Sequence, residues 1–393
     1  MDSKKSTKAA STASYYGFVP MPEVEVLRED IAKAKAFRDG NVKEVHPFSD
    51  IQGKFSGYLE EKIAITRNVL DKKMNGLPQP ITVFYEGPLK GNPHIKKTAK
   101  EKTFNLEIIG NSKSIAEAMI IETAYVIAKD HYPKDELVVE LNTTGDKDSL
   151  ARFGKELANY IKKHASEIPA HCKASIKKDP FEIFSCMEEK CREFQELAPK
   201  TMSYLSETSR RHFMEVLEYL ESLDIPYTMN HTLIGSRSYC SGILFEIKSI
   251  LPDGKMRSVA IGERYNSLAK KVWGKKDVPA IGVAIHINSS SLKTQPAAKK
   301  AKFFFIQLSY DAKLKSLQMM EMLRQAKIPV SQSLSKDKLS AQLLAAEKSK
   351  IPYVIIVGQK EAMENSAVVR NMNTRSQDTI PVKDLVAYLK KLK

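Results

Sequence analysis

Apolar side chains recur every three or four residues along several long segments of the chain, and this spacing is typical of amphipathic helices. The clearest segment is 115–130, in which all but one of the residues on the repeating face are apolar. We expect further helices over 150–164 and through most of 177–222. The repeating face of 115–130 is therefore predicted to pack against a core.

Shorter apolar runs between these helices predict strands. They lie at 137–141, 228–233, 243–250, 258–261 and 279–287. Because these strands outnumber the helices that could serve as long crossovers, most neighbours should pair antiparallel. The first part of the chain is therefore predicted to be an α+β domain, in which an antiparallel sheet is flanked by helices.

The pattern changes near residue 290. The stretch 289–301 is rich in Ser, Ala and Lys and has no apolar period, which is typical of a linker. Beyond it, strands at 303–308 and 353–357 alternate with helical segments, which predicts a small α/β domain with a largely parallel sheet. The predicted parts are a disordered basic tail (1–14), a core (15–288) with a helical insertion at about 177–222, the linker (289–301) and a C-terminal domain (302–393).

The chain is strongly basic, and the charge is unevenly distributed. Its 393 residues include 62 Lys and Arg against 47 Asp and Glu, a net charge of +15. Residues 302–393 contain 16 basic and 8 acidic residues, so 16 − 8 = +8 of the excess lies in this domain. A polyanionic partner and a solvated Lys-rich surface both explain such an excess. Its concentration in one domain favours a nucleic acid.

The four cysteines are too few for a disulfide framework, which is typical of a reducing compartment. None of them forms a C-x-x-C pair. We interpret Cys186 and Cys191 as packing residues rather than metal ligands, so no metal site is expected. No apolar run approaches the length of a membrane span, and residues 1–14 lack the apolar stretch of a secretory signal.

Five segments of the core resemble class II aminoacyl-tRNA synthetases, and specifically the histidine–tRNA ligase family. TLIGSRSYCSGILFEI (232–247) is similar to the family stretch L-V-R-G-L-D-Y-Y-x-x-T-V-F-E, and IGERYNSL (261–268) is similar to G-G-R-Y-D-x-L. The other three resemble motifs 1, 2 and 3 and lie at 16–25, 84–110 and 279–289. The C-terminal domain resembles the family's anticodon-binding domain, so the resemblance runs in order over residues 15–393.

The resemblance implies a class II synthetase core followed by an anticodon-binding domain. It also implies an activity, in which histidine attacks ATP to form an adenylate and the histidyl group then passes to tRNA. Members of the family are cytoplasmic homodimers that associate through the motif 1 region, here 16–25. ATP and Mg²⁺ are therefore expected only if the chain is active, whereas tRNA is expected as a partner in either case.

The arginines that grip the phosphates in this family are missing from the matching positions. Lys90 is the nearest cation in motif 2, while Gly235 and Ser289 stand at the other two arginine positions. Arg237 lies two residues from Gly235 and is a possible substitute. A hydrogen bond to a charged group contributes about 1.5–3 kcal/mol. We therefore predict that the loss of all three arginines ends ordinary adenylate formation.

Several positions that shape the family's histidine pocket are retained. The resemblance assigns them to Glu60, Glu107, Tyr239, Arg264 and Tyr265. The family loop R-P-E-x-T aligns with YLEEK at 58–62 and has lost its threonine, and Cys240 replaces the second tyrosine of the pair that embraces the substrate. The retained residues form either a residual ligand pocket or contacts that hold the core together, because buried charges need partners in both cases.

The candidate tRNA contacts lie in the C-terminal domain. They are Gly358, Gln359, Lys360, Glu361 and Arg370. Gly358 follows a predicted strand and would let backbone N–H groups approach a nucleic acid closely. The next three residues lie at the carboxyl end of that strand, where α/β sheets bind ligands, and Arg370 can reach a phosphate or a base edge. The alternative is an ordinary solvated turn.

Two hypotheses of function remain. In the first, the chain is a non-catalytic paralogue that binds tRNA or regulates a partner protein. In the second, it is a divergent but active histidine–tRNA ligase that uses Lys90, Arg237 and Arg264 as replacement cations. A substitution of Arg237 should change ATP binding only under the second hypothesis.

Overall fold

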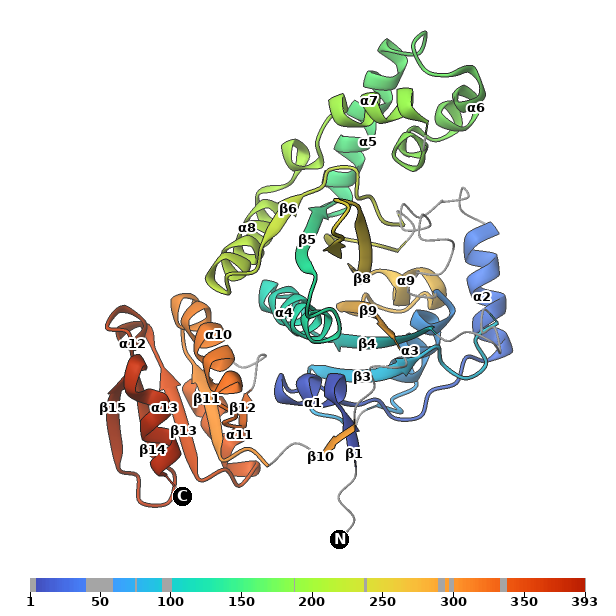
Figure 1. Ribbon diagram of the computed structural model, residues 1–393. Coiled ribbons are helices and arrows are strands. Elements are labelled where there is room, and N and C mark those ends of the chain that lie inside the picture. Colours follow the sequence, from blue (N-terminus) through green and yellow to red (C-terminus); the bar gives the residue numbers. More distant parts are fainter. Residues whose placement is uncertain are drawn as a thin grey trace. The chain divides into compact units, whose positions relative to one another are not determined.

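The computed structural model forms two compact units, which we describe separately (Figure 1). One comprises Pro20–Leu217 and Pro226–Ser291, and the other comprises Met1–Val19, Glu218–Ile225 and Leu292–Lys393. The structure describes residues 5–39, 59–74, 76–93, 101–186, 188–236, 239–288, 294–296, 300–332 and 338–392. Within these ranges no helix combines the length and apolar character needed to cross a membrane.

The first unit is built on an eight-stranded sheet. Its strands are β2 (Val19–Pro20), β3 (Ile81–Gly87), β4 (Glu101–Ile109), β5 (Glu136–Thr143), β6 (Tyr227–Met229), β7 (Ile243–Ile250), β8 (Met256–Arg264) and β9 (Ala280–Asn288). Their order is β2-β3-β4-β9-β8-β7-β5-β6. The pairs from β3 to β5 in this order are antiparallel, and β5 pairs with β6 in parallel. The predicted antiparallel sheet flanked by helices is confirmed.

Helices cover the sheet because their apolar residues face it. They include α2 (Arg28–Asp39), α3 (Leu59–Leu70), α4 (Ser114–His131) and α9 (Leu268–Trp273). α4 corresponds to the helix predicted over 115–130, and it packs on β4, β8 and β9. α3 contacts α2 and α9 and is buried along most of its length. The acidic and basic side chains of α3 are therefore carried into the interior beside the sheet.

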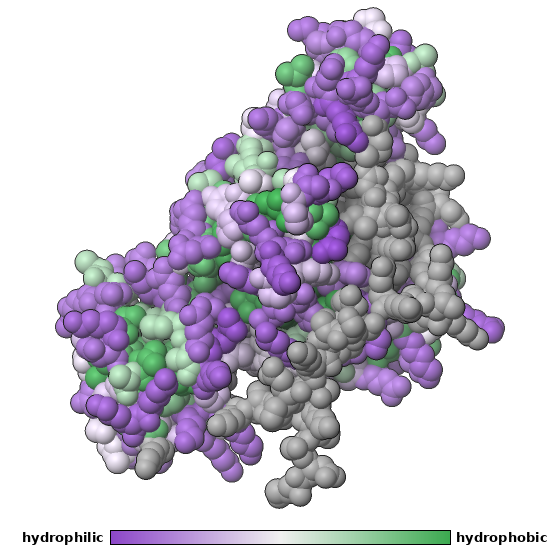
Figure 2. Space-filling view, in the orientation of Figure 1, coloured by the Kyte–Doolittle hydropathy of each residue, from purple (hydrophilic) through white to green (hydrophobic). Residues whose placement is uncertain are grey.

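A group of short helices has an apolar cluster of its own. It comprises α5 (Lys147–Lys163), α6 (Ala170–Lys178), α7 (Glu189–Leu197) and the 3₁₀ turns η2 (Pro180–Ser185) and η3 (Thr201–Tyr204), and α8 (Glu207–Ser222) follows. The cluster includes Phe153, Leu157, Ile176, Cys191 and Phe194. Hydrophilic residues cover most of the visible surface of this group (Figure 2). The helix α5 precedes the predicted insertion at 177–222, and its apolar face packs into the same cluster.

The second unit contains a five-stranded sheet in its C-terminal part. The strands are β11 (Phe303–Gln307), β12 (Val330–Gln332), β13 (Tyr353–Val357), β14 (Ser366–Asn371) and β15 (Gln377–Pro381), in the order β12-β11-β13-β14-β15. The helices are α10 (Tyr310–Gln325), α11 (Leu339–Lys348), α12 (Gln359–Met363) and α13 (Val382–Lys391). β11 pairs in parallel with β12 and β13, whereas β14 is antiparallel to β13 and β15. The sheet is thus mixed rather than largely parallel, since β15 is a polar, exposed strand that the apolar pattern did not predict.

The predicted disordered tail is wrong for the residues that the structure describes. A strand, β1 (Lys5–Thr7), pairs antiparallel with β10 (Thr294–Pro296), which lies within the stretch predicted as a linker. A helix, α1 (Lys8–Tyr15), follows and is capped by the Thr7 hydroxyl, which accepts a hydrogen bond from the Ala10 N–H at 3.2 Å. Small residues such as Ala9 and Ala13 are buried on this helix. Composition alone misses this order because small residues pack closely without an apolar signature.

Candidate functional site

A small cavity lies where α3 meets the central strands of the first unit. It is lined by Lys62, Tyr85, Asn105, Glu107, Ile261, Glu263, Gly282, Val283 and Ala284. Its volume is about 20 Å³, which is enough for one water molecule. Two of the predicted pocket residues, Tyr239 and Tyr265, lie at its edge through their contacts with Lys62. The cavity is therefore the candidate position of the predicted ligand pocket.

The ammonium group of Lys62 is buried in this site. It forms an ion pair with Glu263, and both side chains are less than one-tenth exposed. It also lies 5.2 Å from the ring centroid of Tyr265 and 5.6 Å from that of Tyr239, within the range of a cation–π contact. Burial alone would lower the pKa of Lys62, but Glu263, Cys240 and Glu107 raise it above its usual value. Lys62 is therefore a fixed internal cation.

Glu107 occupies the floor of the cavity. The Tyr265 hydroxyl donates a hydrogen bond to Glu107 Oε2 at 2.7 Å. A side chain at Gly282, the residue paired with Glu107 on β9, would place Cβ only 2.3 Å from the same oxygen. Burial raises the pKa of Glu107 from 4.5 to about 8, although Lys62 and the Tyr265 hydrogen bond oppose this shift. The carboxyl group is therefore closely surrounded by Gly282 and Tyr265, and burial favours its neutral form.

A second buried carboxylate, Glu61, anchors the segment after β3. Its Oε1 accepts hydrogen bonds from the Leu89 N–H at 2.7 Å and from Asn92 Nδ2 at 2.6 Å. The Tyr85 hydroxyl donates to its other oxygen at 3.2 Å. Burial raises the pKa of Glu61. The predicted pocket residue Glu60 is also buried on α3, but it does not line the small cavity.

The structure separates Arg264 from the other predicted pocket residues. Its Nε donates to Glu117 Oε1 at 2.6 Å, and its Nη1 donates to the Asn111 carbonyl at 3.0 Å. His212 Nε2 lies 2.8 Å from the same oxygen of Glu117. Burial would raise the pKa of Glu117, but Arg264 and His212 lower it below its usual value. Arg264 lines a different cavity of about 780 Å³, shared with residues of α8 and α9, and it joins α4 to β8 as a structural ion pair.

The positions predicted to have lost phosphate-binding arginines offer little positive charge. Lys90 is largely exposed and is paired with Glu25. At Gly235 a Cβ would lie 2.2 Å from Leu244 Cδ2, so this position has no room for a side chain. Arg237 and Ser289 fall outside the described residues. Neither described position can therefore supply the forked, fixed cation that an arginine provides.

The candidate tRNA contacts do not form one patch. Gly358 caps α12, and its N–H donates to Glu361 Oε2 at 2.9 Å, so this glutamate has a structural partner. Gln359 and Lys360 are exposed at the start of the same helix. Arg370 lies on β14 and pairs with Val354 of β13. Val354 precedes Gly358 by four residues. At about 3.3 Å per residue, this places Arg370 roughly 13 Å along the strand from Gly358.

The comparisons with known proteins agree with this architecture. Residues 302–392 match the family model described as the anticodon binding domain. The chain is 28% identical over 359 residues to the histidine–tRNA ligase of Halothermothrix orenii, covering 89% of this chain and 85% of that protein. It is also 28% identical over 384 residues to the histidine–tRNA ligase of Fervidobacterium nodosum, covering 95% and 90%. The chain is therefore similar to histidine–tRNA ligases over most of its length.

The chain also resembles a solved structure in its fold. The structure of apo S. aureus histidyl-tRNA synthetase matches with a TM-score of 0.50 at 22% identity, covering 96% of this chain and 93% of that chain. The eight-stranded sheet with its helices therefore has the fold of the core of that synthetase. The five-stranded C-terminal sheet with its helices is the anticodon-binding domain.

Three departures from the family stretches lie in or beside the small cavity, where Glu263 contacts the other two. Lys62 aligns with the threonine of R-P-E-x-T, Glu263 with the second glycine of G-G-R-Y-D, and Cys240 with the second tyrosine of the pair. Lys62 pairs with Glu263, and the Cys240 thiol donates to the same carboxylate. Either charge alone would be an unpaired buried charge, so the substitutions at Lys62 and Glu263 compensate each other.

Sequence reasoning missed Glu61, Lys62 and Glu263 as site residues. The signal was present, because opposite charges appear in two family stretches at positions that are neutral in the family. The two stretches are 201 residues apart, and only the fold brings Lys62 and Glu263 together. The spacing within either stretch could not reveal the pair.

Proposed function

We propose that this chain is a tRNA-binding member of the histidine–tRNA ligase family that does not activate an amino acid. The observation that carries the proposal is the ammonium group of Lys62, which pairs with Glu263 inside the family's histidine pocket. The same residues leave a cavity of about 20 Å³, which is room for about one water molecule. The described pocket is thus filled by a side chain of the protein itself.

Lys62 opposes substrate binding in two ways, through its positive charge and through the space that its side chain occupies. A free amino acid carries an ammonium group, and such a group would compete with Lys62 for Glu263 and Glu107. Removing one partner from a buried ion pair costs about 3–5 kcal/mol. A ligand that displaced Lys62 would therefore bind roughly 10²- to 10⁴-fold more weakly than in an open pocket.

The phosphate side of the site supports the same proposal. Activation transfers an acyl group to the α-phosphate of ATP, and its transition state needs fixed positive charge. Lys90 is exposed and engaged with Glu25, Gly235 has no space for a side chain, and Arg264 is committed to Glu117. ATP with its Mg²⁺ would have to be held by other cations, either the lysines that line the cavity of about 780 Å³, such as Lys270 and Lys271, or residues outside the described ranges.

The C-terminal domain supports a tRNA partner. It matches the anticodon-binding model, and its net charge of +8 attracts a polyanion. In this proposal the chain consists of the core (15–288), the linker (289–301) and this domain (302–393). A cytoplasmic location, a homodimer formed through 16–25 and a regulated partner protein also remain proposals.

Pyrophosphate exchange tests the proposal most directly. The purified full-length chain is incubated with ATP, labelled pyrophosphate and histidine, then with each other amino acid, beside an active histidine–tRNA ligase. We expect no exchange above background, together with retarded migration of tRNA in a gel at low salt. Exchange with histidine would support the divergent ligase instead, and unretarded tRNA would contradict the binding role.

A further inference from the structure

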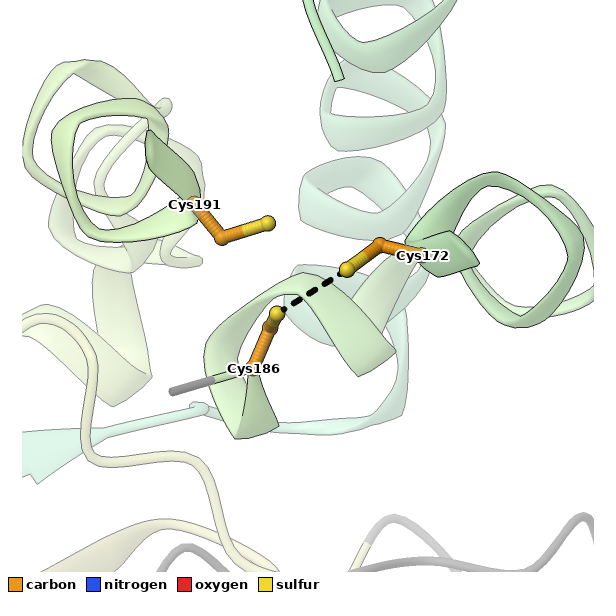
Figure 3. Close-up of side chains that lie close together, drawn as sticks. All are labelled: Cys172, Cys186 and Cys191. Carbon is orange, nitrogen blue, oxygen red and sulfur yellow. Dashed lines mark hydrogen bonds between the residues drawn. The ribbon is translucent and has the colours of Figure 1, made fainter. Parts of the chain in front are cut away.

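We propose that the helical group of the core holds one zinc ion through the thiolates of Cys172, Cys186 and Cys191. Figure 3 shows the three side chains pointing toward a common centre from α6, from the end of η2 and from α7. Their sulfur atoms all lie within 4.8 Å of one another. No part of the proposed tRNA-binding role uses these residues, so the two proposals stand or fall separately.

The sulfur positions fit a shared metal ion. In a tetrahedral site with Zn–S bonds of about 2.3 Å, the ligating sulfurs lie roughly 3.8 Å apart. The Cys172 and Cys186 sulfurs are 3.3 Å apart, and the third is within reach of both. Small side-chain rotations would therefore bring all three to the ligating distance. Cys186 is the partly exposed member, so solvent can fill the fourth position.

The three thiol groups favour a soft metal ion that binds thiolates strongly. Thiolate ligands select Zn²⁺ over hard cations such as Mg²⁺ and Ca²⁺. Three thiolates and one Zn²⁺ carry a net charge of −1. The helices α6 and α7 together contain five basic residues (Lys173, Lys177, Lys178, Lys190 and Arg192) and three acidic residues (Glu189, Glu193 and Glu196), so their excess of 5 − 3 = +2 offsets this charge. Burial raises the pKa values of Cys172 and Cys191, so metal binding must release their protons to solvent.

The helical group has a structural need for such a link. It consists of short helices and two 3₁₀ turns around one apolar cluster, to which Cys172 and Cys191 belong. Small cores of this kind are commonly reinforced by a metal or a disulfide. One zinc ion would join α6, η2 and α7, three segments that are otherwise held by apolar packing and a few hydrogen bonds.

A disulfide between Cys172 and Cys186 is the alternative to the zinc site, because it would use two of the same sulfur atoms. The two sulfurs are already in contact at 3.3 Å, but a disulfide would leave Cys191 without a role beyond packing. The convergence of all three sulfurs favours the metal. The two states exclude each other, because a disulfide removes two of the three thiolates.

The test uses the full-length chain, produced with zinc and purified under reducing conditions. We expect elemental analysis to give one zinc per chain, and substitution by Co²⁺ to give a thiolate-to-cobalt charge-transfer band. Cys172→Ala and Cys191→Ala should lose the metal and weaken this band. The matched control, Cys240→Ala, removes the one cysteine outside the cluster and should retain both signals.

A measurement on the unsubstituted chain guards against variants that fail to fold. A strong chelator should remove the zinc and lower the melting temperature of the wild-type protein, and added Zn²⁺ should restore it. The proposal would be overturned by a metal-free chain that shows no cobalt band, or by a band that survives Cys191→Ala. A Cys172–Cys186 disulfide found by peptide mass spectrometry of the freshly purified protein would overturn it as well.

Discussion

The small cavity of the core and the C-terminal domain differ in how they carry charge. In the cavity, Lys62 and Glu263 form a buried ion pair, and the Cys240 thiol donates to the same carboxylate. The C-terminal domain matches the family model described as the anticodon binding domain over residues 302–392, and it carries a net charge of +8. A pocket released from its ligand can accumulate compensating charges, whereas a surface that still meets a polyanion must keep its fold and charge.

The largest effect should come from breaking the ion pair in the pocket. Lys62→Met leaves the Glu263 carboxylate buried without its cation, so we expect the free energy of unfolding to fall by about 3–5 kcal/mol. The double variant Lys62→Met/Glu263→Gln should lose much less than the sum of the two single variants, because it removes both charges together. Urea denaturation of the full-length chain measures all three.

Lys90→Met is the matched control for this substitution. It removes the same charge from an exposed lysine that is also paired with a glutamate, and its unfolding midpoint should stay at the wild-type value. Equal midpoints for Lys62→Met and wild type would show that the pocket is not stabilised by the ammonium group of Lys62.

The next largest effect is a pH dependence of the free energy of unfolding, which we attribute to Glu107 in the pocket. The pKa of Glu107 is about 8 in the folded chain against 4.5 ordinarily, so between these values the folded state holds one more proton than the unfolded state. Stability should therefore fall as pH rises through this window, by about 1.4 kcal/mol per pH unit from this group. Glu107→Gln should remove that contribution.

Urea unfolding at about pH 5, 6 and 7 compares the two proteins within this window. Because Glu107 interacts with Lys62, Glu263 and Glu61, the difference between the two curves reports Glu107 together with its effect on these neighbours. Parallel curves would mean that the carboxyl group is ionised in the folded chain, so that Lys62 and the Tyr265 hydrogen bond outweigh burial.

The smallest effect tests the other side of the comparison. Lys360 is exposed at the start of α12, so Lys360→Ala should weaken tRNA binding a few-fold. It should also reduce the slope of log affinity against log salt by about 1. Arg370→Ala tests the other candidate contact, near the opposite end of β13. In gel-shift titrations, a larger effect of Arg370→Ala than of Lys360→Ala would place the main tRNA contact on β14, and no effect of either variant would contradict both contacts.

The sequence predicted the fold where burial is periodic. α4 and the antiparallel core follow from apolar spacing, because a face that must meet the sheet repeats every three or four residues. α1 and β15 escaped prediction for opposite reasons. α1 is buried through small side chains, and β15 is held by strand pairing while its side chains remain exposed.

The site was harder to predict than the fold. Glu107, Tyr239 and Tyr265 do gather around the cavity, as the family stretches imply. Arg264 does not, since Glu117 on a separate helix holds it elsewhere. Cys172 was not grouped with Cys186 and Cys191, because it precedes them by 14 residues or more and comes close only after α6 and η2 fold back. Contacts between distant segments decide each of these cases.

The contact of α1 with α10 has a consequence for the order of events during synthesis. The Tyr15 hydroxyl donates to the Met320 carbonyl at 3.0 Å, across 305 residues of chain. At about 5–20 residues per second, a ribosome needs roughly 15–60 s to make the second partner after the first. For that interval the residues of α10 that α1 contacts have not been made, so α1 is synthesised well before it can reach its final place.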